Sequence, residues 1–181
     1  MNITPLFPSF LASEEPDVDN NIITKYCNSL IGDSVTIDPS VDELFELTEW
    51  MVSRANRLRE LQGLHDYLKV NLNECWVNTL SNQLSYINHP HAHADNWISF
   101  VYYVSANKDS GNIIFMSPHQ NIELTIPRSY VSNGNLHNSP RWTVTPFNGL
   151  AIAFPSWLTH YVEHNRSSEP RISIAYNFTL S

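Results

Sequence analysis

The sequence predicts an α+β domain in which a helical first part supports a second part made of many short strands. Up to about residue 64, apolar residues recur every three to four positions, as they do in amphipathic helices. Beyond that point, short runs of β-branched and aromatic residues alternate with turn residues, which is typical of a barrel or sandwich. We expect one domain from 181 residues, with residues 1–70 as helical support and residues 71–181 as the all-β half.

The composition excludes several classes of protein. Acidic residues outnumber basic ones by 18 to 10 and no basic run occurs, so duplex nucleic acid is not an expected partner. No apolar run reaches the roughly 18 residues of a membrane span, and the first residues lack a secretion signal. Cys27 and Cys75 have no metal-binding spacing and are expected to be reduced. These features predict a cytoplasmic protein without a membrane partner.

Two helices are predicted in the first part. Residues 1–17 contain three prolines and are expected to be an irregular lead-in, followed by a short helix over residues 18–31. A longer helix begins at Ser40, which forms a capping box with Glu43, and ends near Gly63. Its buried stripe is expected to comprise Leu44, Leu47, Met51, Ala55, Leu58 and Leu61.

Strands fill the second part. They are predicted at residues 74–78, 83–87, 98–104, 112–116, 122–126, 142–145, 149–154, 160–163 and 171–180. Residues 108–111 are expected to form a turn. Residues 128–141, rich in Ser, Asn, Gly and Pro, are predicted to be a long surface loop that serves as a substrate lid.

A histidine-rich stretch precedes the strand at 98–104. In an extended strand, His89, His91, His93 and Asp95 project to the same face. Three imidazoles and a carboxylate make a poor core but a good metal site. The spacing of His93 and Asp95 suits two ligands of a facial triad for Fe(II), which needs one more histidine, and His160 is the candidate. The alternative is that these histidines form a solvated polar edge.

The last predicted strand carries a second set of candidates. A polar turn follows the strand that begins at His160, and the chain then returns with Arg171 and Ser173 on one face. If that face looks into the barrel, Arg171 requires an anionic ligand or an internal acid, because a buried unpaired charge is costly. The alternative is an ion pair of Arg171 with Glu163 or Glu169 at the rim.

Several short motifs occur together in a characteristic order. They are His93-x-Asp95, Tyr102-Tyr103, Gly111-x-Ile-Ile-Phe115, Phe154-Pro-Ser-x-Leu-x-His160 and Arg171-x-Ser173. In this order the sequence resembles the Fe(II)/2-oxoglutarate-dependent oxygenases. The likeness is greatest to the small 2-oxoglutarate oxygenases of phages and marine bacteria, which are related to prolyl hydroxylases. It spans roughly residues 76 to 178.

The resemblance implies a fold and a metal site. The fold would be a double-stranded β-helix, a jelly-roll or cupin-like barrel, with the N-terminal helices packed on one sheet. His93 and Asp95 would be the proximal ligands of Fe(II), and His160 would be the distal ligand. In the closest relatives the motif reads more like His-x-His, which points to His91 with His93. We favour His93 and Asp95, with His91 as substitute or outer partner, because a carboxylate balances the iron charge.

The resemblance also implies a cosubstrate and a reaction. Arg171 would pair with the C5 carboxylate of 2-oxoglutarate, Ser173 would assist, and Tyr103 would contact the cosubstrate. With Fe(II) and O2, such an enzyme hydroxylates a substrate while 2-oxoglutarate is decarboxylated to succinate. The substrate, a small molecule or a peptide, cannot be identified from the sequence, nor can the oligomeric state.

Two other functions fit part of the pattern. A cupin-type metal protein or a 2-oxoglutarate-independent dioxygenase would use His91, His93 and His160. Such a protein has no need of an inward Arg171, so this residue discriminates between the two. A non-catalytic binding domain that retained the barrel would be expected to have lost a ligand or the arginine, and this sequence retains them all.

Overall fold

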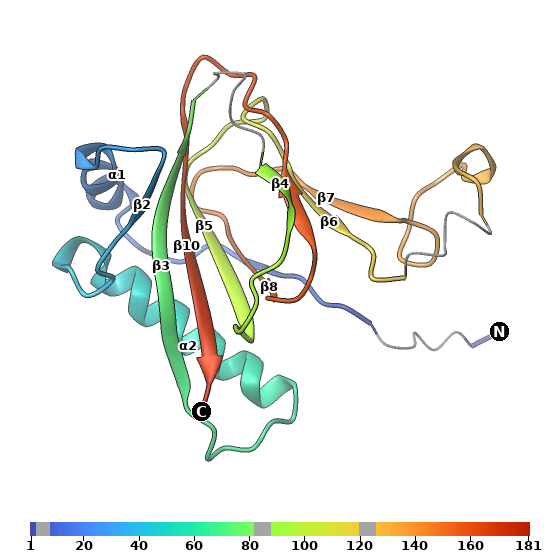
Figure 1. Ribbon diagram of the computed structural model, residues 1–181, viewed down its shortest axis with the longest axis horizontal. Coiled ribbons are helices and arrows are strands. Elements are labelled where there is room, and N and C mark those ends of the chain that lie inside the picture. The colour runs from blue at the N-terminus through green and yellow to red at the C-terminus, as the bar shows by residue number, and fades with distance from the viewer. Residues whose placement is uncertain (3–7, 82–87, 120–125) are drawn as a thin grey trace.

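A computed structural model describes residues 1–2, 8–81, 88–119 and 126–181. It contains two antiparallel sheets and two α-helices (Figure 1). The predicted strand at 83–87 lies outside the described residues, as does the strand at 122–126 apart from its last residue. Among the described residues, no helix combines the length and the apolar character needed to cross a membrane.

The larger sheet has six strands, and the smaller sheet has four. In spatial order the larger consists of β1 (Ala12–Glu14), β8 (Ala151–Pro155), β5 (Ile98–Ser105), β10 (Arg171–Leu180), β3 (Val70–Leu80) and β2 (Ser34–Thr36). The smaller consists of β4 (Asn88–His91), β9 (His160–Val162), β6 (Ile113–Met116) and β7 (Arg141–Val144). The helices are α1 (Asn20–Ser29) and α2 (Phe45–Leu61), and two short 3-10 helices are η1 (Asp42–Leu44) and η2 (Arg128–Tyr130). The predicted α+β class is confirmed.

Strand β10 separates the two halves of the interior. Successive residues of a strand face opposite sides. Ile172 and Ile174 therefore join the cluster that contains Met51 of α2. Arg171 and Ser173 take the other side, where a second cluster includes Tyr103. The helices thus cover the outer face of the larger sheet, and the inner face looks toward the smaller sheet (Figure 1).

The start of the long helix differs from the prediction. Ser40 does not form a capping box, because its hydroxyl and its N–H both donate to Asp38 Oδ1, at 2.7 and 2.9 Å. The chain instead enters α2 through η1, whose N-cap position is held by Val41 without a side-chain hydrogen bond. The predicted end is confirmed, since Gly63 follows the helix with a φ of 67°.

Most of the predicted apolar stripe is buried. Leu44, Leu47, Met51 and Ala55 are fully buried, and Leu58 packs partly against the same cluster. Each large side chain of this kind stabilises the fold by about 1.5–3 kcal/mol through burial. Leu61 is 65% exposed, so the stripe ends one turn earlier than predicted.

Two short edge strands were not predicted. Strand β1 lies within the proline-rich segment that we expected to be irregular, and it pairs with β8 through Ala12 and Ala153. Strand β2 pairs with β3 at the opposite edge. Each has three residues, too few for an alternating pattern to show in the sequence.

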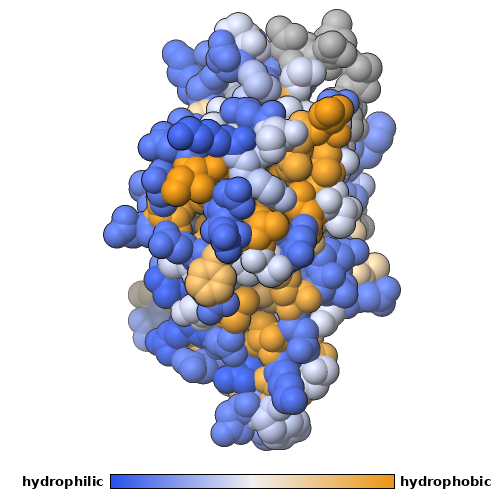
Figure 2. Space-filling view, turned by 90° about the vertical axis from the view of Figure 1, so that its left-hand side faces the viewer, coloured by the Kyte–Doolittle hydropathy of each residue, from blue (hydrophilic) through white to orange (hydrophobic). Residues whose placement is uncertain are grey.

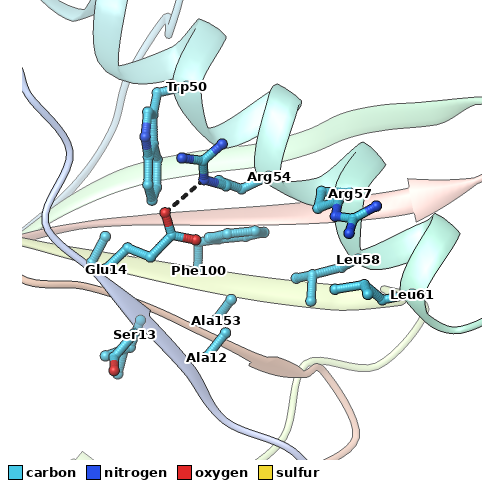
Figure 3. A pocket seen from close by; sticks show the side chains of 12 residues that line it. Ala12, Ser13, Glu14, Trp50, Arg54, Arg57, Leu58, Leu61, Phe100 and Ala153 are labelled. Carbon is cyan, nitrogen blue, oxygen red and sulfur yellow. Dashed lines mark hydrogen bonds and ion pairs between the residues drawn. The ribbon is translucent and has the colours of Figure 1, made fainter.

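The helix side of the molecule carries two pockets. A cavity of about 100 Å³ lies between α2, β1 and β8, where the Arg54 side chain contacts the Trp50 ring and pairs with Glu14 at 2.8 Å (Figure 3). A wider pocket lies beside α1 and η1, and its lining includes the apolar Ile22 and Phe45. Figure 2 shows this side, where orange apolar side chains lie among hydrophilic ones.

The long loop at 128–141 lies at the outer end of the β6–β7 pair, away from the larger sheet (Figure 1). It begins with η2, and its large side chains, such as Tyr130, are exposed. Its role as a lid stays a prediction.

Candidate metal centre

Three histidines come together at the edge of the smaller sheet. His91 ends β4, His160 begins β9, and the two residues are directly paired in the antiparallel ladder. His93 lies two residues beyond β4. One potential ligand atom from each of the three lies within 4.8 Å of the others. The ring centroids are 4.4 Å apart for His91 and His160, and 5.1 Å apart for His93 and His160. This cluster can hold a metal ion.

Hydrogen bonds to carbonyl groups orient two of the three rings. His160 Nδ1 lies 2.9 Å from the Leu158 oxygen, and His91 Nδ1 lies 2.8 Å from the His89 oxygen. A carbonyl oxygen only accepts, so each Nδ1 must carry the hydrogen. The lone pair of a neutral ring is then on Nε2, the arrangement that metal-binding histidines use.

The environment favours the neutral form of two of these rings, His93 and His160. Burial lowers the pKa of His160 to about 4; the hydrogen bond with the Leu158 carbonyl acts in the opposite direction, and the neighbouring His91 and His93 contribute to the lowering. Burial, followed by the neighbouring His91, also lowers the pKa of His93. Protons and metal ions compete for the same nitrogen, so a lowered pKa leaves the lone pair available at neutral pH.

Asp95 lies apart from this cluster. The expected extended strand ends at His91, and the chain then turns, with Asp95 exposed at a φ of 62°. The prediction that His89, His91, His93 and Asp95 share one face of a continuous strand is therefore wrong. Among the residues that the structure describes, His91, His93 and His160 form the group close enough to share an ion. Which side chains bind metal stays a prediction.

Aromatic side chains surround the candidate site on the barrel side. The rings of Phe154 and Phe115 lie 4.7 and 5.8 Å from that of His160, and Trp76 lies 5.7 Å from His93. Phe154 and Phe115 also belong to the inner core cluster with Tyr103. The three histidines thus border the apolar interior between the two sheets.

Arg171, Ser173 and Tyr103 face that same interior. Ser173 and Tyr103 are paired across β10 and β5, and all three side chains are buried. Arg171 is only 3% exposed, which places it inside the barrel and not at the rim, and its Nη1 donates to the Gly111 oxygen at 3.2 Å. Burial raises the pKa of Tyr103 to about 12, although the Arg171 charge acts in the opposite direction. The phenol is therefore neutral and able to donate.

Gly111 is a residue whose role the sequence analysis did not identify. It has a φ of 87°, and a Cβ atom there would collide with the main-chain carbonyls of Glu163 and His164. Only glycine therefore fits where the chain passes β9 and presents its carbonyl to Arg171. The glycine in the motif Gly-x-Ile-Ile-Phe was the available signal.

The donor set fits the metal that the sequence suggested. Neutral imidazoles suit iron among other divalent metals, and three protein ligands leave positions open for further ligands. Arg171 and Ser173 place a positive charge and a hydroxyl inside the same barrel, as an anionic second ligand requires.

Comparisons with known proteins identify the family of this chain. A family model described as "Putative 2OG-Fe(II) oxygenase" matches residues 74–177, which is more than half of the chain. No curated protein sequence matches.

Solved structures show the same fold. An oxidoreductase of the 2OG-Fe(II) oxygenase family from Burkholderia pseudomallei matches with a TM-score of 0.63 at 15% identity, covering 93% of this chain and 84% of the other. The viral collagen prolyl hydroxylase from Paramecium Bursaria Chlorella virus-1 matches with a TM-score of 0.61 at 13% identity, covering 99% and 98%. The epimerase SnoN from nogalamycin biosynthesis, described as α-ketoglutarate-dependent, has a TM-score of 0.62 at 15% identity, covering 93% and 78%. At these identities the structures establish the double-stranded β-helix fold, and the family match over residues 74–177 establishes that the chain belongs to the 2OG-Fe(II) oxygenase family.

Proposed function

We propose that this chain is an Fe(II)- and 2-oxoglutarate-dependent hydroxylase that converts 2-oxoglutarate to succinate while it oxidises an unidentified substrate. The observation that supports this most strongly is the burial of Arg171 beside Ser173 and Tyr103, in the same barrel that carries the three histidines. A protein that only bound a metal would have no use for this second set of residues.

The histidines are proposed to hold the iron. His91 and His160 present Nε2, because their Nδ1 atoms are engaged by carbonyl oxygens, and His93 completes the set. Bound Fe(II), with 2-oxoglutarate and O2, supplies an oxidant able to attack an unactivated C–H bond. Phe115 and Phe154 keep water from the barrel side of His160, which protects the protein from side reactions.

The residues on β10 and β5 are proposed to hold the cosubstrate. The Arg171 guanidinium would pair with the distal carboxylate of 2-oxoglutarate, and the Ser173 hydroxyl would assist it. The neutral Tyr103 phenol would be a further donor to this ligand. Because these groups are buried, each charge-assisted bond is stronger than it would be in water, at about 1.5–3 kcal/mol.

The test is the turnover of 2-oxoglutarate to succinate by the wild-type protein with Fe(II) and O2. Arg171→Ala is expected to raise the KM for 2-oxoglutarate at least about tenfold, since even one charge-assisted bond is worth that much. Arg171→Lys recovers only part of this loss, because an ammonium lacks the planar fork. Iron binding stays intact in both variants.

Arg166→Ala is the matched control, because this exposed arginine lies in the loop that leads to β10. It is expected to retain the wild-type KM. If the wild-type metal protein neither binds 2-oxoglutarate nor decarboxylates it, the proposal fails and the cupin-type alternative is favoured.

The product identifies the reaction. A panel of amino acids, peptides, nucleosides and small metabolites is screened for substrate-stimulated succinate formation, and each product is examined by mass spectrometry. Hydroxylation adds one oxygen atom to the substrate. An unchanged mass with inverted stereochemistry would identify an epimerase instead.

A further inference from the structure

A chain of hydrogen-bonded polar side chains runs from the turn after β8 across β5 and β10 to β3, which are neighbours in the larger sheet. Ser156, Ser99 and Asn177 are each at most 1% exposed, although they come from the turn after β8, from β5 and from β10. Ser99 Oγ lies 2.8 Å from Ser156 Oγ and 2.7 Å from Asn177 Oδ1, and Asn177 Nδ2 lies 2.7 Å from a carboxylate oxygen of Glu74 on β3. Hydrogen bonds therefore join four separate segments of the polypeptide.

The direction of these bonds follows from what each group can donate. The Glu74 carboxylate only accepts, so Asn177 must present its amide N–H to it and its oxygen to Ser99. Ser99 has one hydroxyl proton and donates it to that oxygen. Ser156 must then donate to Ser99. All three bonds point toward Glu74, and bonds aligned in this way strengthen one another.

Both ends of this chain reach the turn at 93–97, which carries His93. At one end, the Ser156 carbonyl accepts the His93 N–H at 2.9 Å, and the Ser156 N–H donates to the Trp97 oxygen at 3.1 Å. The main chain of Ser156 thus holds both sides of the turn at 93–97. At the other end, the exposed Glu74 carboxylate accepts a hydrogen bond from Asn96 Nδ2 in the same turn, at 3.4 Å.

Of the three histidines, His93 is the one that strand pairing does not hold in place. His91 and His160 are fixed by strand pairing and by their carbonyl partners. His93 lies in the turn beyond β4, where no ladder orders it. The hydrogen bond from the His93 N–H to the Ser156 carbonyl replaces the missing ladder.

We propose that Ser156, Ser99, Asn177 and Glu74 form a positioning chain that fixes His93 for metal binding. This inference rests on the proposed metal centre. Loss of an outer partner of a metal-binding histidine typically lowers metal affinity roughly 10–100-fold. Ser99 and Glu74 lie outside the group of three histidines that can share an ion, so we assign them as positioning residues and not as ligands.

The test compares the Co(II) affinity and the Co(II) absorption spectrum of full-length variants. Ser99→Ala removes the central link and is expected to weaken Co(II) binding at least about tenfold and to change the spectrum. Glu74→Leu should do the same. Glu74→Gln keeps an oxygen that accepts from Asn177, so it should recover most of the affinity. Thr48→Val is the control, because it removes the hydroxyl that donates to the Pro39 oxygen on the helix side of the sheet.

Hydrogen exchange on the metal-free protein gives a second measurement. Ser99→Ala should speed the exchange of the amides at 93–97, and Glu74→Gln and Thr48→Val should leave it unchanged. If Ser99→Ala binds Co(II) with wild-type affinity and spectrum, the positioning role is wrong, whether or not exchange has changed. If the wild-type protein itself does not bind Co(II), the metal centre is wrong and this inference falls with it, so the two failures are distinguishable.

Discussion

His91 and His160 are direct partners in the β4–β9 ladder, with their ring centroids 4.4 Å apart. In an antiparallel pair, side chains of opposed residues lie on the same face and in contact. Two members of the candidate metal centre are therefore placed by sheet register alone. The third member, His93, depends on the turn that follows.

The first prediction concerns the ligand set. His91→Ala and His160→Ala should each weaken Co(II) or Fe(II) binding by more than the roughly 100-fold that an outer partner can cost, because two ligands rarely hold a labile ion. Asp95→Ala should bind as the wild type does, since Asp95 is exposed and outside the cluster. Metal titration of the purified variants checks this. Loss of binding in Asp95→Ala would return the assignment to His93, Asp95 and His160.

The second prediction concerns pH and stability of the metal-free protein. The pKa of His160 is about 4 in the folded protein, against about 6.5 when unfolded. As pH falls below 6.5 the unfolded chain takes up a proton that the folded chain does not, so the free energy of unfolding decreases. The loss from this residue amounts to about 3 kcal/mol by pH 4.

Urea denaturation at several pH values measures this effect. His160→Gln cannot titrate, so its free energy of unfolding should fall less between pH 6.5 and 4 than that of the wild type. The Asp and Glu side chains titrate in the same way in both proteins, so their contribution to the pH dependence cancels when the two are compared. Equal pH dependence in the two proteins would mean that His160 is not held neutral by burial.

The third prediction concerns Gly111. Gly111→Ala should destabilise the protein by at least about 1–3 kcal/mol, because alanine is strained at this φ and its Cβ would collide with the Glu163 carbonyl. It should also weaken 2-oxoglutarate binding, since the Gly111 carbonyl orients Arg171. Thermal melting and a titration of the metal-loaded protein with 2-oxoglutarate report the two effects.

Gly134→Ala is the control for this substitution. Gly134 lies in the exposed loop, has no positive φ and meets only the Ser139 side chain. It should melt at the wild-type temperature. A Gly111→Ala protein with wild-type stability and affinity would contradict the role assigned to this glycine.

The fourth prediction concerns the packing of α2. Met51 is fully buried against the larger sheet, so Met51→Ala should lower the free energy of unfolding by about 2–5 kcal/mol. Leu61→Ala removes a similar side chain from an exposed position and should have little effect. Denaturation curves compare the two. Equal losses would show that α2 is not anchored through the buried part of its stripe.

The sequence predicted the helices and strands whose hydrophobic pattern extends over many residues. Strands β5 and β10 were predicted because eight and ten residues show β-branched and aromatic character clearly, and α2 was predicted because its stripe spans several turns. The pair of Arg171 and Ser173 followed from the strand period of two. The family and the fold were also predicted, and both are confirmed.

The sequence did not predict features that depend on which neighbouring group forms a hydrogen bond, or on contacts between residues far apart in the sequence. Ser40 has the right spacing for a capping box, but its hydroxyl donates a hydrogen bond to the Asp38 carboxylate instead. Asp95 is spaced from His93 as two residues on the same face of a strand are, but a turn removes Asp95 from the strand. The bonds of Ser99 link residues 57 and 78 positions away. No local pattern records such pairings.

The central place of β10 has a consequence for how the protein is made. This strand pairs with both β3 and β5, yet it follows them by many residues in the chain. A growing polypeptide therefore exposes two unpaired strand edges until β10 emerges, and such edges invite association with other chains. The three candidate metal-binding histidines also precede Arg171 in the sequence, so the proposed metal ligands are all synthesised before the proposed cosubstrate-binding arginine. Chaperones that shield the open sheet during translation should therefore raise the yield of active protein.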